Sequence, residues 1–216
     1  MEQVRAAMQR PLPGRAAQLT MAPRPRPITP PAGITPRQAG VLLLLYPLDS
    51  PHSSDRVLYT VLTVRQATMN HHAGQVSLPG GGWEVGDRSY RETALREAQE
   101  ELGIPITNVE ILGPLTPLYI PPSNNLIHPF VAYTPQRPVF HPNPTEVADL
   151  LETPISLLMD PANRREEEWM WRGVTLHVPL YALTYSPQEQ GEGGASREFK
   201  VWGATAIVLA EFLALF

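Results

Sequence analysis

Residues 78–104 read LPGGGWEVGDRSYRETALREAQEELGI, and the rest of the chain is organised around them. The stretch begins with a Pro-Gly-Gly-Gly turn and passes through a polar loop to Asp87. From Ser89 to Leu102 the side chains sort onto two faces of a helix. One face carries a threonine and three glutamates, spaced so that they become neighbours on the helix: Thr93, Glu97, Glu100 and Glu101.

Three carboxylates crowded on one helical strip repel one another, by roughly 0.2–0.5 kcal/mol for each pair. A hard divalent cation would reverse that sign, and Mg²⁺ typically binds through one or two carboxylates plus substrate phosphates. The alternative is a solvated acidic helix face. The glycine turn, Arg96 beside the first glutamate and Gly103 at the helix end favour a metal site.

The helix also carries a family resemblance. Residues 96–104, REAQEELGI, resemble the REUxEExGU half of the Nudix box, where U is a bulky or aliphatic residue. Gly81, five residues and then Asp87 resemble the Gx5E half. Asp87 replaces the usual glutamate, and eight residues rather than seven separate it from Arg96, so a contribution of Asp87 to the site stays open. The resemblance implies an α+β fold, a Nudix-type α/β/α sandwich with a mixed β-sheet between helices.

Three further segments resemble the coenzyme A pyrophosphatase-like branch of that family. Before the box, residues 62–65 (LTVR) and 74–81 (GQVSLPGG) resemble the signature LLTxR…GxxxFPGG. After it, residues 201–206 (VWGATA) resemble the segment IWGxTA that begins the last helix of the branch. Two positions depart from the branch, because Gln66 replaces a small residue and Asn70 replaces an arginine.

The resemblance implies a Mg²⁺- or Mn²⁺-dependent hydrolase that cleaves the pyrophosphate bond of a nucleoside diphosphate linked to another moiety. The expected substrate is coenzyme A or a derivative, cut to adenosine 3′,5′-bisphosphate and 4′-phosphopantetheine. ADP-ribose or a dinucleotide is the alternative within the enzyme class. A non-catalytic Nudix domain that senses a nucleotide is the alternative of another class.

Metal ions assist pyrophosphate hydrolysis by polarising phosphoryl oxygens and lowering the pKa of bound water. The expected metal ligands are Glu97, Glu100 and Glu101. The expected catalytic residues are Glu97, Glu100, Arg96 and Glu146. Arg96 is expected to orient the glutamates through charge-assisted hydrogen bonds, while the general base stays open among the three catalytic glutamates. The expected substrate-binding residues are Arg65, His71, Gly80, Gly81 and Gly82.

Composition excludes several classes of protein. A net charge of −4 and a single lysine, Lys200, argue against a nucleic-acid surface, which needs clustered cations. The absence of cysteine excludes disulfides, thiolate-zinc sites and a cysteine nucleophile. The longest apolar runs, such as residues 41–45, are far below the roughly 20 residues of a membrane span. We therefore expect a cytoplasmic protein that acts on a small-molecule nucleotide, without nucleic-acid or membrane partners.

Two parts are expected: a proline-rich N-terminal arm, residues 1–37, and a Nudix hydrolase domain, residues 38–216. The segment 11–36 has little periodicity and is predicted to be extended or disordered. Its scattered apolar residues indicate that part of it lies over the domain or over a partner subunit, so a homodimer stays open. The hydrophobic patterns further along predict strands at 39–47 and 56–65, a short helical turn at 146–151, a hairpin at 169–183 and an apolar helix at 202–216.

Overall fold

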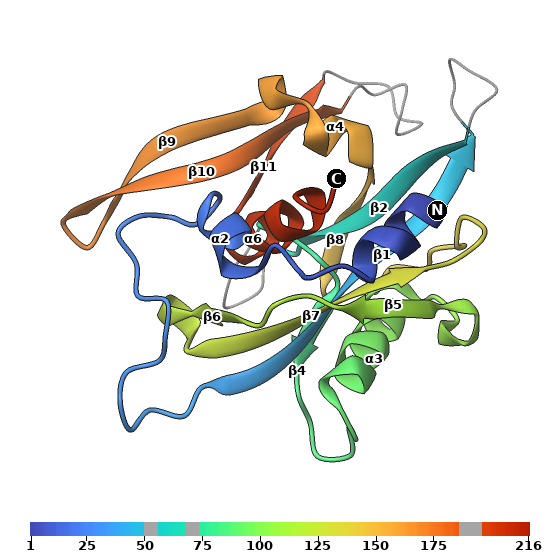
Figure 1. Ribbon diagram of the computed structural model, residues 1–216, viewed down its shortest axis with the longest axis horizontal. Helices are drawn as coiled ribbons and strands as arrows, with labels where there is room; N and C mark the ends of the chain where they lie inside the picture. The colour runs from blue at the N-terminus through green and yellow to red at the C-terminus, as the bar shows by residue number, and fades with distance from the viewer. Residues whose placement is uncertain (50–55, 68–73, 186–195) are drawn as a thin grey trace.

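The computed structural model describes residues 1–49, 56–67, 74–185 and 196–216. These residues form an α+β sandwich with a mixed β-sheet between helices (Figure 1), which confirms the predicted fold class. The helices are α1 (Glu2–Met8), α2 (Gly14–Leu19), α3 (Tyr90–Leu102), α4 (Ile155–Met159) and α6 (Gly203–Leu213). The strands are β1 (Arg37–Asp49), β2 (Arg56–Arg65), β3 (Val76–Ser77), β4 (Gly80–Gly82), β5 (Glu110–Pro114), β6 (Leu118–Ile120), β7 (Asn125–Tyr133), β8 (Val147–Pro154), β9 (Arg164–Trp171), β10 (Val174–Tyr185) and β11 (Arg197–Trp202). Short 3₁₀ helices cover Ile106–Asn108, Pro121–Ser123 and Pro161–Asn163.

The larger sheet has the strand order β3-β2-β1-β7-β5, with β4 paired to β1, β6 to β7 and β8 to β2. Strands β1 and β7 run parallel, whereas β1 and β2 form the predicted antiparallel pair. A second sheet has the order β11-β10-β9, and the hairpin of β9 and β10 contains the predicted one.

Strand β1 lies at the centre of the sandwich and is covered on both faces. Leu42, Leu44 and Tyr46 pack in the core beneath α3, while Leu43 and Leu45 pack in the core that contains α6. A strand buried on both faces reads as a continuous apolar run rather than as an alternation, which explains the sequence VLLLLY. The sheet therefore separates a layer with α3 from a layer with α6 and the second sheet (Figure 1).

Helix α3 begins and ends where local signals place it. The Ser89 hydroxyl accepts a hydrogen bond from the Glu92 backbone N–H (3.2 Å), which satisfies one of the unpaired donors of the first turn. Gly103 takes a left-handed conformation (φ 64°) and its N–H donates to the Gln99 carbonyl. Glycine reaches this conformation without strain, so the helix stops there.

The N-terminal arm packs on the rest of the chain. Val4, Ala7, Met21 and Ala22 are buried in the same core as α6, which confirms that part of the arm lies over the domain. The expectation that the whole segment 11–36 is extended was wrong, because it contains α2. The boundary between arm and domain near residue 37 stays a prediction, as does the homodimer.

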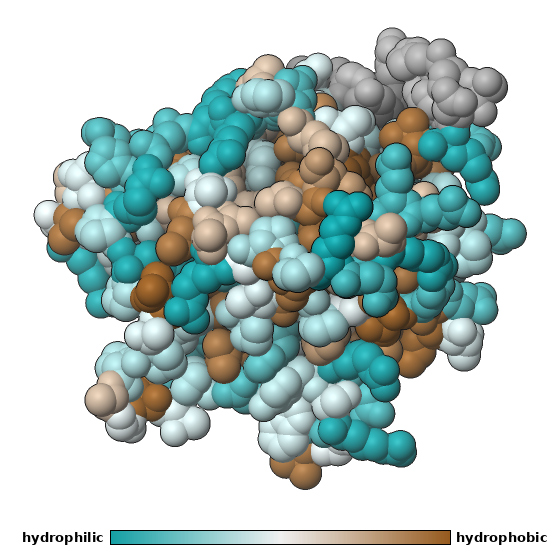
Figure 2. Space-filling view, viewed as in Figure 1, coloured by the Kyte–Doolittle hydropathy of each residue, from teal (hydrophilic) through white to brown (hydrophobic). Residues whose placement is uncertain are grey.

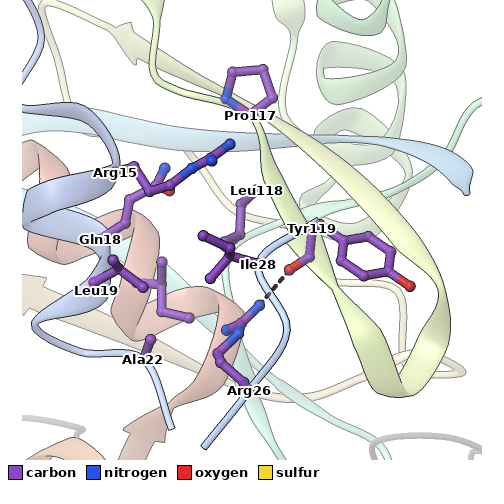
Figure 3. A pocket seen from close by; sticks show the side chains of 10 residues that line it. Arg15, Gln18, Leu19, Ala22, Arg26, Ile28, Pro117, Leu118 and Tyr119 are labelled. Atoms are coloured by element: carbon purple, nitrogen blue, oxygen red, sulfur yellow. Dashed lines mark hydrogen bonds between the residues drawn. The ribbon is translucent and has the colours of Figure 1, made fainter. Parts of the chain in front are cut away.

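A buried carboxylate joins the arm to the last helix. Glu211 of α6 is 0% exposed, and it accepts hydrogen bonds from the Gln18 side-chain amide (2.8 Å) and the Thr116 hydroxyl (2.6 Å). Near it, arm residues and the start of β6 enclose a hollow of about 20 Å³, shown in Figure 3. The Arg26 guanidinium donates to the Tyr119 carbonyl at the rim of that hollow. Polar contacts thus hold the arm at a defined place on the domain.

One local expectation was wrong, and one strand was not predicted. Residues 146–151 do not form a helical turn, because β8 pairs antiparallel with β2 over Val147–Pro154 and extends the sheet. Strand β11 was not predicted, and it pairs with β10 immediately before α6. Residues 50–55 and 186–195, for which the sequence indicates loops, lie outside the described residues.

Hydrophilic and hydrophobic residues are interspersed on the face shown in Figure 2. No helix among the described residues is long and apolar enough to cross a membrane.

Candidate active site

The glycine turn and α3 are fitted to each other. Gly80 donates its backbone N–H to Glu101 Oε2 (3.1 Å). The Gly81 backbone packs against the Glu97 carboxylate so closely that a Cβ atom added at Gly81 would lie 2.4 Å from Glu97 Cδ. Gly80 itself has a φ of 153°, and a Cβ there would lie 2.5 Å from the Gly40 carbonyl oxygen. Only glycine allows this approach, so the turn places two carboxylates of α3 against backbone.

Glu100, the third glutamate of the expected strip, is more exposed than the other two. The side chains of Glu97 and Glu101 are 13% and 3% exposed, whereas that of Glu100 is 54% exposed. Glu100 Oε2 accepts a hydrogen bond from Arg96 Nη1 (3.0 Å), one turn earlier on the helix. Glu97 and Glu101 are therefore shielded from solvent, whereas Glu100 is more exposed and shares the Arg96 Nη1 donor with Glu97.

Arg96 holds the polar side of the helix together. Its Nη1 also donates to Glu97 Oε1 (2.9 Å), and its Nη2 donates to the Gly82 carbonyl (2.9 Å). These are the charge-assisted hydrogen bonds that the sequence predicted. Arg96 thus connects two of the glutamates to the end of the glycine turn.

Asp87 is the partner of Arg96. Its two carboxylate oxygens accept from Arg96 Nε (3.1 Å) and Nη2 (3.2 Å), and its Oδ2 also accepts from the Thr93 hydroxyl (2.9 Å). Hydrogen bonds from Arg96, with smaller help from Glu84 N–H and Thr93, lower the pKa of Asp87 to about 2. The structure therefore uses both oxygens of Asp87 to fix Arg96.

Burial disfavours the charged forms of Glu97 and Glu101. Burial raises the pKa of Glu101 to about 7, and the charges of Glu97 and Glu146 raise it further. The Gly80 N–H and Arg65 act in the opposite direction. Burial also raises the pKa of Glu97, partly offset by Arg96. A site in which burial disfavours the charged form of two carboxylates is one that a cation would stabilise.

Arg65 and Glu146 come to this pair from outside the helix. Arg65 Nη1 lies 3.5 Å from Glu101 Oε1. Among the described residues, the buried Arg65 Nε has no hydrogen-bond partner. Glu146 lies in a loop that is tied to the end of α3, because Asn143 N–H donates to the Glu101 carbonyl (3.0 Å) and its side-chain amide to Glu146 Oε1 (3.3 Å). The negative charge of Glu146 raises the pKa of both Glu97 and Glu101.

The donor set fits a hard divalent cation in charge and chemistry. Within the described ranges, no three histidine, aspartate or glutamate side chains converge as a ready-made metal cage. Mg²⁺ does not require one, since it keeps several waters and commonly uses one or two carboxylates with substrate phosphates. Glu97 and Glu101 supply such a pair beside a glycine turn that leaves backbone approachable.

Most of the expected site residues are thus brought to one place. The described members around the glycine turn and the C-terminal half of α3 are Arg65, Gly80, Gly81, Gly82, Arg96, Glu97, Glu100, Glu101 and Glu146. His71 lies outside the described residues. The sequence left the role of Asp87 open, and its signal there was a carboxylate nine residues before Arg96. The sequence gave no indication of the role of Asn143.

Comparisons with known proteins agree with this geometry. Residues 37–172 match the model of the NUDIX domain family. The chain is 33% identical over 183 residues to "Nudix hydrolase 22, chloroplastic" of Arabidopsis thaliana, covering 83% of this chain and 55% of that protein. It is 42% identical over 138 residues to "Uncharacterized Nudix hydrolase NudL" of Pectobacterium atrosepticum, covering 64% of this chain and 65% of that protein. The chain therefore spans only part of the length of these relatives.

A solved structure shows the same fold. The crystal structure of a MutT/nudix family protein from Enterococcus faecalis superimposes with a TM-score of 0.50, over 87% of this chain and 64% of that chain, at 16% sequence identity.

Proposed function

Because this chain belongs to the Nudix family, we propose that it is a Mg²⁺- or Mn²⁺-dependent diphosphatase that cleaves the pyrophosphate bond of a nucleoside diphosphate linked to another moiety. One observation carries the proposal: the glycine turn packs against Glu97 and Glu101 of α3 and shields both carboxylates from solvent, and this burial raises the pKa of each. A purely structural helix gains nothing from that arrangement, since repulsion and burial both act against it.

In this proposal Glu97 and Glu101 hold the cation, and Glu100 bridges from the helix surface or takes a proton. A divalent ion bound there would polarise phosphoryl oxygens and lower the pKa of a bound water. Arg65 Nε is buried and lacks a hydrogen-bond partner among the described residues. In this proposal it donates a hydrogen bond to a phosphate oxygen of the substrate. Arg96 keeps Glu97 and Glu100 oriented through its fixed contacts with Asp87.

The general base is proposed among Glu97, Glu100 and Glu146. A base must come within hydrogen-bond reach of the attacking water. Glu100 is the most exposed of the three, and its only described side-chain partner is Arg96. Glu146 lies in the loop that Asn143 ties to α3, and its negative charge raises the pKa of both Glu97 and Glu101.

Coenzyme A or a derivative is the substrate that we favour. The support comes from the sequence segments at 62–65, 74–81 and 201–206, which resemble the coenzyme A pyrophosphatase-like branch. The first two of these segments meet at the site, since Arg65 and Gly80 both contact Glu101. ADP-ribose or a dinucleotide is the alternative substrate, and a non-catalytic nucleotide sensor is the alternative of another class.

A product analysis tests the proposal. The protein would be incubated with coenzyme A, ADP-ribose and a dinucleotide, each with Mg²⁺, with Mn²⁺ and with EDTA, and the products separated by chromatography. We expect adenosine 3′,5′-bisphosphate and 4′-phosphopantetheine from coenzyme A, and no products with EDTA. Turnover of ADP-ribose without turnover of coenzyme A would overturn the substrate choice, and no turnover of any compound would support the sensor.

A further inference from the structure

The first turn of α6 touches the strand that leads into the glycine turn. The Thr205 hydroxyl donates a hydrogen bond to the Val76 carbonyl (3.1 Å), and both residues are buried. Val76 belongs to β3, which is only two residues long and lies at the end of the strand order of the larger sheet. An edge strand this short has few backbone partners, so side-chain hydrogen bonds help to hold it: the one from Thr205, and one between the Thr63 and Ser77 hydroxyls (2.9 Å).

The strand leads directly to the two buried glutamates. Val76 is four residues before Gly80, whose N–H donates to Glu101, and five before Gly81, which backs onto Glu97. Between them, the Pro79 carbonyl accepts from the Leu42 N–H (2.9 Å). A movement of β3 would therefore be passed to the backbone that sets the positions of both carboxylates.

The placement of Thr205 is fixed by its neighbours. Trp202 pairs with Leu180 at the end of β11, and its indole ring meets that of Trp169 edge to face at 4.7 Å between centroids. Gly203 then takes a positive φ of 62°, which lets the chain turn from strand into helix. Two residues later Thr205 faces β3. The segment VWGATA at 201–206 thus has a physical use that the proposed site itself does not explain.

We propose that Thr205 is a positioning residue for the active site: its hydroxyl fixes β3 and through it the glycine turn against Glu97 and Glu101. The proposal rests on the proposed function for its effect on turnover. Thr205 donates to the Val76 carbonyl on the α6 side of the sheet, so it acts through the backbone.

Three variants test it. Thr205→Val keeps the shape of the side chain and removes the hydroxyl, whereas Thr205→Ser keeps the hydroxyl. Thr153→Val is the matched control, because Thr153 of β8 is also buried and its hydroxyl forms a hydrogen bond with Tyr185 OH of β10 (2.6 Å) rather than with the strand before the glycine turn. Displacing catalytic groups by a fraction of an ångström costs rate more than binding, so we expect kcat of Thr205→Val to fall about 10-fold with KM within about two-fold. We expect Thr205→Ser to recover kcat to within about two-fold of the parent, and Thr153→Val to lower Tm without lowering kcat.

A second measurement separates this proposal from the proposed function. Mn²⁺ binding by electron paramagnetic resonance does not require turnover, and we expect Thr205→Val to weaken it by roughly 3- to 10-fold while Thr153→Val does not. If the parent hydrolyses no pyrophosphate, the proposed function fails and the Mn²⁺ titration still decides the role of Thr205. Equal Mn²⁺ affinity in the parent and Thr205→Val, equal loss in the two valine variants, or no recovery with serine would each overturn the proposal.

Discussion

Helices α3 and α6 lie on opposite faces of one sheet, and they handle charge in opposite ways. Helix α3 exposes a network of charged side chains whose partners, such as Asp87 and Arg96, lie within ten residues of one another. Helix α6 is buried from Thr205 to Phe212 and has one charged residue, Glu211, whose partners come from residues 18 and 116. The exposed charge network of α3 can therefore be interpreted from the local sequence, whereas the buried charge of α6 can be interpreted only within the fold.

The largest test of this contrast is on α3. We expect Glu101→Gln to lower kcat on the order of 10³-fold, because it removes a charged oxygen donor from the cation site. Stability at pH 8 should not fall, because the raised pKa of Glu101 means that its charged form is disfavoured in the folded state. Steady-state kinetics and thermal unfolding check both. Glu84→Gln, on the exposed loop before the helix, is the control. Full activity in Glu101→Gln would contradict the proposed cation site on α3.

The reverse test is on α6. We expect Glu211→Leu to lower the free energy of unfolding by about 2–3 kcal/mol, because one N–H of the Gln18 amide and the Thr116 N–H and hydroxyl would lose their acceptor in the interior. The kcat of the folded variant should stay near that of the parent. Urea denaturation measures the first and initial rates the second, with the exposed Glu168→Gln as control. Unchanged stability would show that the buried carboxylate contributes nothing net.

A smaller effect is expected from a change in the hydrogen-bond network around Arg96. Asp87→Asn should lower kcat/KM by about 10- to 100-fold, the range typical of groups that orient a metal ligand. Asp87 fixes Arg96, and without its charge Arg96 is free to pair more closely with Glu97 and Glu100. Asp87→Glu keeps a carboxylate and is the control. Equal kcat/KM in the parent and Asp87→Asn would mean that Arg96 needs no partner.

The smallest expected effect is a pH dependence. The folded-state pKa of Glu101 is raised to about 7, so the folded protein binds a proton more tightly than the unfolded chain. Without metal, this residue's contribution to stability therefore decreases as pH rises from the unfolded pKa through 7. Because metal binding releases that proton, the increase in Tm caused by Mn²⁺ should grow between pH 6 and pH 8. Differential scanning fluorimetry measures it, and an equal pH trend in Glu101→Gln would assign the trend to another group.

Local chemistry made much of α3 predictable. Ser89 and Gly103 mark its ends, and the spacing of its glutamates places them on one side. Spacing does not give burial, however: the side chain of Glu100 is 54% exposed, whereas those of Glu97 and Glu101 are 13% and 3% exposed.

Long-range pairing decided the elements that the sequence did not predict correctly. Residues 147–154, VADLLETP, contain helix-forming alanine, leucine and glutamate, yet they form β8 because β2 offers an edge to pair with. The Arg65–Glu101 contact and the Gln18–Glu211 contact join residues that are far apart in sequence. No local pattern specifies such pairs, which arise only when the layers of the sandwich meet.

The pairing of Gln18 with Glu211 spans 193 residues and sets an order of events during synthesis. The arm leaves the ribosome long before α6 exists, so Val4, Ala7, Met21 and Ala22 have no finished core to enter for most of translation. The core layer that contains α6 can close only when the last helix arrives, and until then the nascent chain presents apolar surface that a chaperone could bind.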